Sequence, residues 1–150
     1  MPSTGVRGLD RDVEVTRQWI TVVAAAFGTT DREFAHRALR GWLRTVRDRL
    51  PAEVAAHFAA ELPALLRGVF YDGWRPGRVP RKDDLDAFTE HFAADAGIGR
   101  ADVPRTAALV TEALAARLPS GALTHVLDDL PRDLRRLLHP SAAPEHGTPI

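Results

Sequence analysis

Residues 49–70 read RLPAEVAAHFAAELPALLRGVF, and residues 117–138 read RLPSGALTHVLDDLPRDLRRLL. Each stretch opens on Arg-Leu-Pro, carries a histidine at the same place, and reaches a second Leu-Pro pair that is followed by Leu-Arg. Extended without a gap, residues 37–71 and 105–139 share nine identities in 35 positions. Two copies of one unit bury the same faces, so the repeated positions mark structural ones. This repeat predicts that the chain is a duplicated helical unit.

Outward from the repeat, apolar residues recur three and four positions apart, the spacing of amphipathic helices. Helices are expected at about 10–27, from Asp31 to Val46, from Pro51 to Leu62, from Pro63 to Gly73, at about 83–96, at about 101–118, and from Pro119 and Pro131 onward. The prolines fall where a first helical turn tolerates them. No alternating segment is long enough to indicate a strand. We predict an all-α, single-domain bundle of about eight helices, built from two pseudo-repeated four-helix units.

The predicted helical domain spans residues 10–139. Its first unit covers residues 10–74, a linker punctuated by proline and glycine covers 75–82, and the second unit covers 83–139. Residues 1–9 and 140–150 offer little apolar surface to bury, so we expect a mobile N-terminus and a mobile C-terminal tail.

The composition narrows the classes of function. Basic and acidic residues number 20 each, so no overall charge draws the chain to nucleic acid or to an anionic membrane. The chain has no cysteine, which excludes disulfides, thiolate zinc sites and cysteine nucleophiles. No apolar run approaches the roughly 20 residues that span a bilayer, and the N-terminus lacks the apolar region of a signal peptide. We expect a soluble cytoplasmic protein with no nucleic-acid or membrane partner.

After its second Leu-Pro pair, the first copy continues into Tyr71-Asp72-Gly73-Trp74-Arg75-Pro76, which the second copy lacks. Together with the helices before it, this segment resembles the DUF2267 family over roughly residues 15–138. These are small all-helical proteins with a duplicated unit, common in actinobacteria, and their hallmark is Tyr-[Asp/Glu]-Gly-Trp-x-Pro. The resemblance implies the same fold and an actinobacterial source. It leaves the activity open, because the function of the family is unknown.

The unrepeated segment is the predicted binding site. Its candidate binding residues are Tyr71, Asp72, Gly73, Trp74, Arg75 and Pro76. Gly73 suits a left-handed helix end, from which Trp74 can fold back over the helix. The Asp72 carboxylate is expected to accept a hydrogen bond from the indole or from Arg75. One interpretation is an aromatic plug that locks the first unit onto the linker. The other is a docking surface, because aromatic and arginine side chains dominate interface hot spots.

Two histidine–acid pairs, His57 with Glu61 and His125 with Asp129, each place their members one helical turn apart. Ligands at that spacing share a helix face, as a metal site requires, but each pair supplies only two ligands. A hydrogen bond that recurs because the unit recurs is the expected explanation. No metal site and no other cofactor is predicted.

The linker carries the one local cluster of positive charge, formed by Arg75, Arg78, Arg81 and Lys82. This segment also departs from the family pattern, which often has Lys-x-Arg-His where this chain has Arg81-Lys82-Asp83-Asp84. Asp83 and Asp84 are expected to neutralise a solvated loop. The alternative is that the cluster meets a phosphate or an acidic partner.

No catalytic residue is predicted, because the chain has no nucleophile elbow and no phosphate-binding loop. We therefore predict a non-enzymatic interaction module that docks a protein partner, or a second copy of itself, through Tyr71–Pro76. The alternative is a small-ligand or metal-binding protein with a pocket between the two units, lined by His57, Glu61 and Trp74. An enzyme ranks last.

Overall fold

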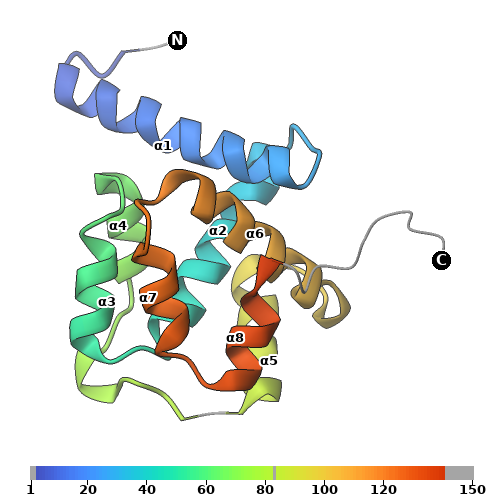
Figure 1. Ribbon diagram of the computed structural model, residues 1–150. Helices are drawn as coiled ribbons and strands as arrows, with labels where there is room; N and C mark the ends of the chain where they lie inside the picture. Colours follow the sequence, from blue (N-terminus) through green and yellow to red (C-terminus); the bar gives the residue numbers. More distant parts are fainter. Residues whose placement is uncertain (1–2, 83, 141–150) are drawn as a thin grey trace.

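The computed structural model describes residues 3–82 and 84–140. Its α-helices are α1 (Arg7–Ala26), α2 (Arg32–Arg47), α3 (Ala52–Ala59), α4 (Ala64–Tyr71), α5 (Leu85–Ala96), α6 (Val103–Arg117), α7 (Ala122–Asp128) and α8 (Arg132–Leu138) (Figure 1). The described ranges contain no strand, so the predicted all-α bundle of about eight helices is confirmed. Of the predicted tail at 140–150, only Pro140 lies within the described residues.

Helix α2 is the element around which the others pack. It lies against α5 most extensively, and against α1, α4 and α6 as well (Figure 1). Its buried residues are Ala35, Ala38, Leu39, Gly41, Trp42, Leu43, Thr45, Val46 and Arg47. They surround most of the helix, so α2 is buried by neighbours on several sides. A Cβ at Gly41 would lie 2.9 Å from the Cβ of Ala96, so the glycine permits the close approach of α5.

Helix α1 begins at Arg7, earlier than the predicted residue 10. The Thr4 amide and hydroxyl and the Ser3 hydroxyl all donate to the Asp10 carboxylate, at 2.8 to 2.9 Å. These bonds lower the pKa of Asp10, the backbone bond from Thr4 most of all. Ser3 and Thr4 thus contact α1 through the Asp10 side chain, whereas the N-cap residue Val6 makes no side-chain cap.

Three of the four Leu-Pro prolines lie one position before their helices. Pro51, Pro63 and Pro131 are the N-cap residues of α3, α4 and α8, outside the first turn where they were predicted. Pro119 differs, because α7 begins only at Ala122, after Gly121 with φ of +87°. Proline cannot adopt the left-handed conformation that Gly121 has at the N-cap of α7. Helix α7 therefore begins three residues after Pro119, whereas α3 begins directly after Pro51.

The two predicted units share one core. The Trp42 indole N–H donates to the Thr111 hydroxyl at 2.9 Å, and both side chains are buried. Some residues 68 positions apart make matching contacts: Arg67 donates to the Leu62 carbonyl at 2.9 Å, and Arg135 donates to the Leu130 carbonyl at 3.2 Å. The duplication itself stays a prediction.

Candidate functional site

The predicted binding segment begins where α4 ends. Gly73 has φ of +81°, the left-handed conformation expected of it, and the Trp74 amide donates to the Tyr71 carbonyl at 2.9 Å. The rings of Tyr71 and Trp74 lie 5.1 Å apart and pack, half-buried, against the core. Arg75 is exposed, and Pro76 opens a 3₁₀ turn over Pro76–Arg78. The aromatic residues thus anchor the segment, while the residues after Trp74 face solvent.

Asp72 does not make the hydrogen bond that was predicted for it. Its carboxylate accepts from Arg44 of α2 at 2.9 Å, and its side chain remains 74% exposed. The buried indole nitrogen of Trp74 has no hydrogen-bond partner within the described part of the chain. The prediction was wrong because the local sequence does not show that α2 passes beside the end of α4.

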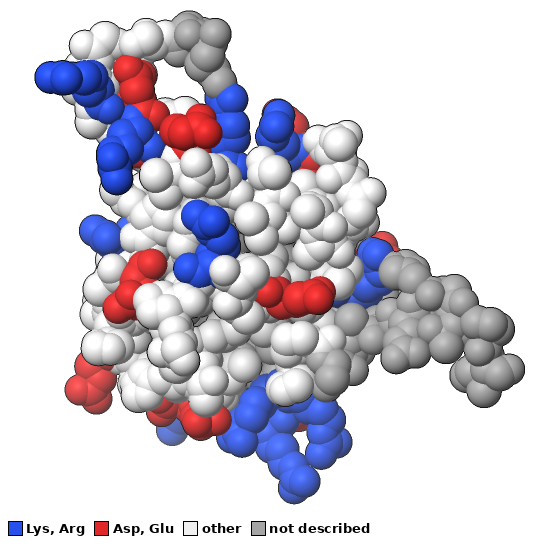
Figure 2. All heavy atoms as spheres, turned by 45° about the horizontal axis from the view of Figure 1, so that its top comes forward, with Lys and Arg blue, Asp and Glu red and all other residues white. Residues whose placement is uncertain are grey.

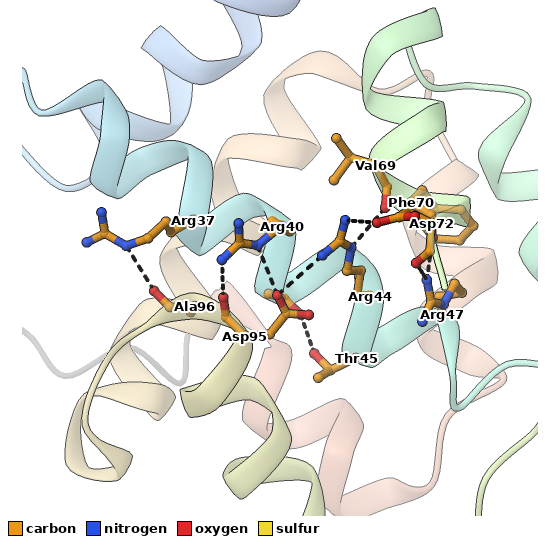
Figure 3. Close-up of polar contacts among 11 residues, drawn as sticks. Arg37, Arg40, Arg44, Thr45, Arg47, Val69, Phe70, Asp72, Asp95 and Ala96 are labelled. Carbon is orange, nitrogen blue, oxygen red and sulfur yellow. Dashed lines mark hydrogen bonds and ion pairs between the residues drawn. The ribbon is translucent and has the colours of Figure 1, made fainter. Parts of the chain in front are cut away.

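Figure 3 shows an arginine ladder along α2, formed by Arg37, Arg40, Arg44 and Arg47. Arg37 donates to the Ala96 carbonyl at 3.3 Å, Arg40 to the carboxylate and carbonyl of Asp95 at 2.9 and 2.6 Å, Arg44 to the Val69 carbonyl at 3.0 Å, and Arg47 to the Phe70 and Asp72 carbonyls at 2.7 Å. This ladder was not predicted from the sequence. Its spacing of three, four and three residues was visible and places the four side chains on one helix face.

The ladder joins the last turns of α4 and α5, where helix carbonyls lack intrahelical partners. Positive charge at a helix C-terminus is also favourable toward the helix dipole. Arg47 is only 4% exposed, so its bonds to Phe70 and Asp72 fix the backbone at the start of the predicted binding segment. Two ladder residues also affect His36: its pKa is lowered first by burial and then by the charges of Arg40 and Arg44.

Beyond this anchored segment lies a basic pocket of about 540 Å³, lined by Asp48, Gly73, Arg75, Arg78, Val79 and Arg81. The Arg81 amide donates to the Asp48 carbonyl at 2.7 Å, which ties the loop to the end of α2. The loop of residues 75–82 runs along the lower side of Figure 1, and basic side chains gather at the lower edge of Figure 2. Three of the four predicted linker cations therefore meet at one opening, together with one carboxylate.

Asp84, predicted to neutralise this cluster, makes no ion pair with its cations among the described residues. Its carboxylate accepts from the Ala87 amide at 2.9 Å and caps α5. Asp83, the other residue expected to do so, lies outside the described residues. An Asp placed just before a helical pattern is a recognisable N-cap, so the sequence contained this information.

A second opening of about 220 Å³ lies between α3 and α7. It is lined by His57, Phe58, Glu61, Pro119, Ser120, Gly121, Ala122, His125 and Val126. The rings of His57 and His125, equivalent positions of the repeat, lie 5.9 Å apart, edge to face. Neither histidine bonds to the carboxylate one turn away within the described residues, so the expected hydrogen bonds are absent there. Trp74, predicted to line the same pocket, packs elsewhere, at the end of α4.

These histidines do not complete a metal site in the part of the chain that is described. No three His, Asp or Glu side chains there come close enough together to hold an ion. Among the described helices, none is both long and apolar enough to cross a bilayer.

The sequence profile of a family described as "Uncharacterized conserved protein (DUF2267)" matches residues 16–137. No curated protein matches the chain.

Proposed function

The chain belongs to the DUF2267 family, and we propose that it is a non-enzymatic interaction module. It docks an acidic segment of a partner protein at the basic pocket and the adjoining Tyr71–Pro76 stretch. The single observation that carries this proposal is the convergence of Arg75, Arg78 and Arg81 on one open pocket.

Guanidinium groups suit an acidic partner because their planar fork donates two parallel hydrogen bonds to a carboxylate. Within the fold, Arg40 and Arg44 of the ladder already donate one hydrogen bond each to a carboxylate, that of Asp95 and that of Asp72. The exposed side chains of Arg75 and Arg78 differ, since neither has a partner among the described residues. The free energy needed to remove water from these two guanidinium groups is offset by their attraction to the partner's negative charge. No other group of the described protein competes for them.

The pocket is also preorganised on its inner side. Arg47 and Arg44 hold the backbone from Val69 to Asp72, and the Tyr71–Trp74 ring pair anchors the start of the loop to the core. A backbone that is ordered before binding loses less conformational entropy when a partner docks. The anchored aromatics therefore support docking, although they themselves lie half inside the fold.

The proposal is tested with a fluorescein-labelled peptide of alternating Asp and Glu, titrated by fluorescence anisotropy. The double variant Arg75→Glu/Arg78→Glu is expected to weaken binding at least about tenfold, and wild-type binding is expected to weaken as salt is added. The matched control is Arg11→Glu/Arg136→Glu, which changes the same charge at exposed positions on α1 and α8. Equal loss in both variants, or no wild-type binding at low salt, would contradict the proposal.

The second candidate function is small-ligand binding between α3 and α7. It is favoured by the opening beside His57, Glu61 and His125, where two imidazoles and a carboxylate line a concave surface. Native mass spectrometry of the purified protein tests it. A bound species that persists in an exposed-histidine control, His91→Ala, and disappears in His57→Ala/His125→Ala would support this function.

A further inference from the structure

The first turns of α1 carry apolar side chains that the fold leaves uncovered. Val6 is 52% exposed, Leu9 49% and Val13 41%, and the fourth large exposed hydrophobic residue of the described chain is Leu65 of α4, at 43%. Figure 1 shows that α1 lies across one end of the bundle and that its N-terminal turns extend past the helices beneath it. Three of the four exposed residues therefore lie on, or at the start of, a projecting helix.

The exposed residues continue a stripe that begins inside the protein. Positions 6, 9, 13, 16, 20 and 23 are Val, Leu, Val, Thr, Ile and Val, spaced alternately three and four apart. Val23 is buried in the core and Ile20 is half-buried, while Val13 and Leu9 follow on the same face beyond the bundle. An alternating spacing of three and four is the seam of a coiled coil, which is covered by a second helix.

Where the stripe leaves the bundle, it forms one wall of an apolar groove of about 250 Å³. The groove is lined by Val13, Thr16, Arg17, Ile20, Arg32 and Leu65. Two arginines thus border the apolar surface of the groove. A segment that complements this groove has apolar side chains flanked by acidic residues. In the projecting part of α1, Asp10 and Asp12 flank the stripe that contains Leu9 and Val13, while Arg7, Arg11 and Glu14 lie away from the stripe.

We infer that the occupant is a second copy of this chain, with the two α1 helices antiparallel. In the register that alternates the seam residues, Leu9 of one copy packs against Ile20 of the other and Val13 packs against Thr16. The same register sets Asp10 beside Arg17, and the two-fold symmetry makes this ion pair twice. Zero net charge means that no long-range repulsion opposes association.

The antiparallel direction follows from where the bundle lies. A parallel second helix would continue toward Val23, where the rest of the same molecule already covers the stripe. An antiparallel helix instead places its own bundle beyond the first turns of the other α1. The seam covers only a few turns, so the dimer is expected to be weak and concentration-dependent.

Sedimentation equilibrium of the full chain over a range of concentrations tests this inference. Wild type is expected to dimerise in the micromolar range, and Leu9→Glu is expected to remain monomeric. Arg11→Glu is the control, since residue 11 falls outside the seam and is exposed. Circular dichroism checks that each variant keeps its helices, which is expected because residue 9 is already half exposed.

A charge swap tests the partner and the register together. Asp10→Arg and Arg17→Asp should each raise the dimer dissociation constant at least about threefold, and the double variant should recover most of the loss. Loss of the Asp10 bonds at the helix start would weaken α1 in both Asp10 variants, so recovery cannot come from folding alone. A wild type that stays monomeric to about 1 mM, equal dissociation of the Leu9→Glu and Arg11→Glu variants, or no recovery would overturn the inference.

Discussion

At the scale of single residues, the ring of Trp74 and its indole N–H contribute differently to stability. Its ring packs against that of Tyr71 at an interplanar angle of 39° and against the core, while its neighbour Arg75 lines the basic pocket. Its buried indole N–H has no partner among the described residues, and such a donor costs free energy on burial. The ring therefore stabilises the fold through apolar contact, and the N–H does not contribute.

Replacing Trp74 separates these contributions. Trp74→Ala should lower the free energy of unfolding by about 2 kcal/mol, because a half-buried aromatic is removed. Trp74→Phe should stay within about 1 kcal/mol of wild type, since it keeps an aromatic ring and removes the unpaired donor. Urea denaturation followed by circular dichroism measures both. If Trp74→Ala is as stable as wild type, the segment is not a structural plug.

His36 is a residue at which stability should depend on pH. Its pKa is lowered below the ordinary 6.5, first by burial and then by Arg40 and Arg44, with Glu33 opposing. The unfolded chain then binds more protons than the folded one below pH 6.5, so stability falls as the pH drops through that region. His36→Gln should reduce the loss of stability between about pH 7.5 and about pH 5. Parallel curves for the two proteins would show that the histidine does not contribute.

At the scale of elements, the contact between α2 and α5 depends on small residues and on the arginine ladder. Gly41 and Ala96 bring the two helices together, and beside them Arg37 and Arg40 bond to the last residues of α5. Close packing and hydrogen bonding therefore hold the same two helices together. A change in the distance between α2 and α5 disturbs the packing and the hydrogen bonds at once.

Two glycine substitutions test this contact. In Gly41→Ala the new Cβ would lie 2.9 Å from the Ala96 Cβ and 3.2 Å from its backbone nitrogen, so α5 must shift at a cost of about 2 kcal/mol. Gly68→Ala is the control, because a Cβ on this α4 residue meets nothing within 4 Å and should stabilise the helix by roughly 0.5 to 1 kcal/mol. Thermal unfolding measures whether each substitution raises or lowers the stability of the protein. Two shifts of the same sign would contradict the packing argument.

At the scale of the whole molecule, the two predicted units interleave. α2 of the first unit packs against α5 and α6 of the second, and α1 packs against α6. The buried bond from Trp42 to Thr111 also crosses between them. Each unit therefore covers much of the other's core, and neither presents a complete core of its own.

The isolated segment 1–74 should for this reason fail to fold cooperatively. Without α5 and α6, the apolar residues of α2 would face water, and its ladder arginines would lose their partners on α5. We expect poor dispersion in its NMR spectrum and no sharp thermal transition, whereas the full chain unfolds in one transition. Cooperative unfolding of the segment would show that the first unit is an independent domain.

Much of this architecture was predictable from local pattern. The Leu-Pro pairs, the spacing of apolar residues and Gly73 indicated where helices begin, which faces they bury and how α4 ends. These features depend on backbone conformation and on periodicity over one or two turns, which neighbouring residues decide. The late start of α7 and the capping role of Asp84 also had local causes, in Gly121 and in the position of the carboxylate.

The sequence by itself determined the all-helical bundle, the repeated positions and the location of an unrepeated aromatic segment. Only the tertiary structure decided which side chains are already paired and which remain available. Asp72 and Arg44 are 28 residues apart in the sequence, yet their side chains bond to each other. Arg75, Arg78 and Arg81 likewise meet Asp48, from the end of α2, at one opening. Burial and pairing depend on contacts between distant segments, and local periodicity carries no information about which helix end passes beside which arginine.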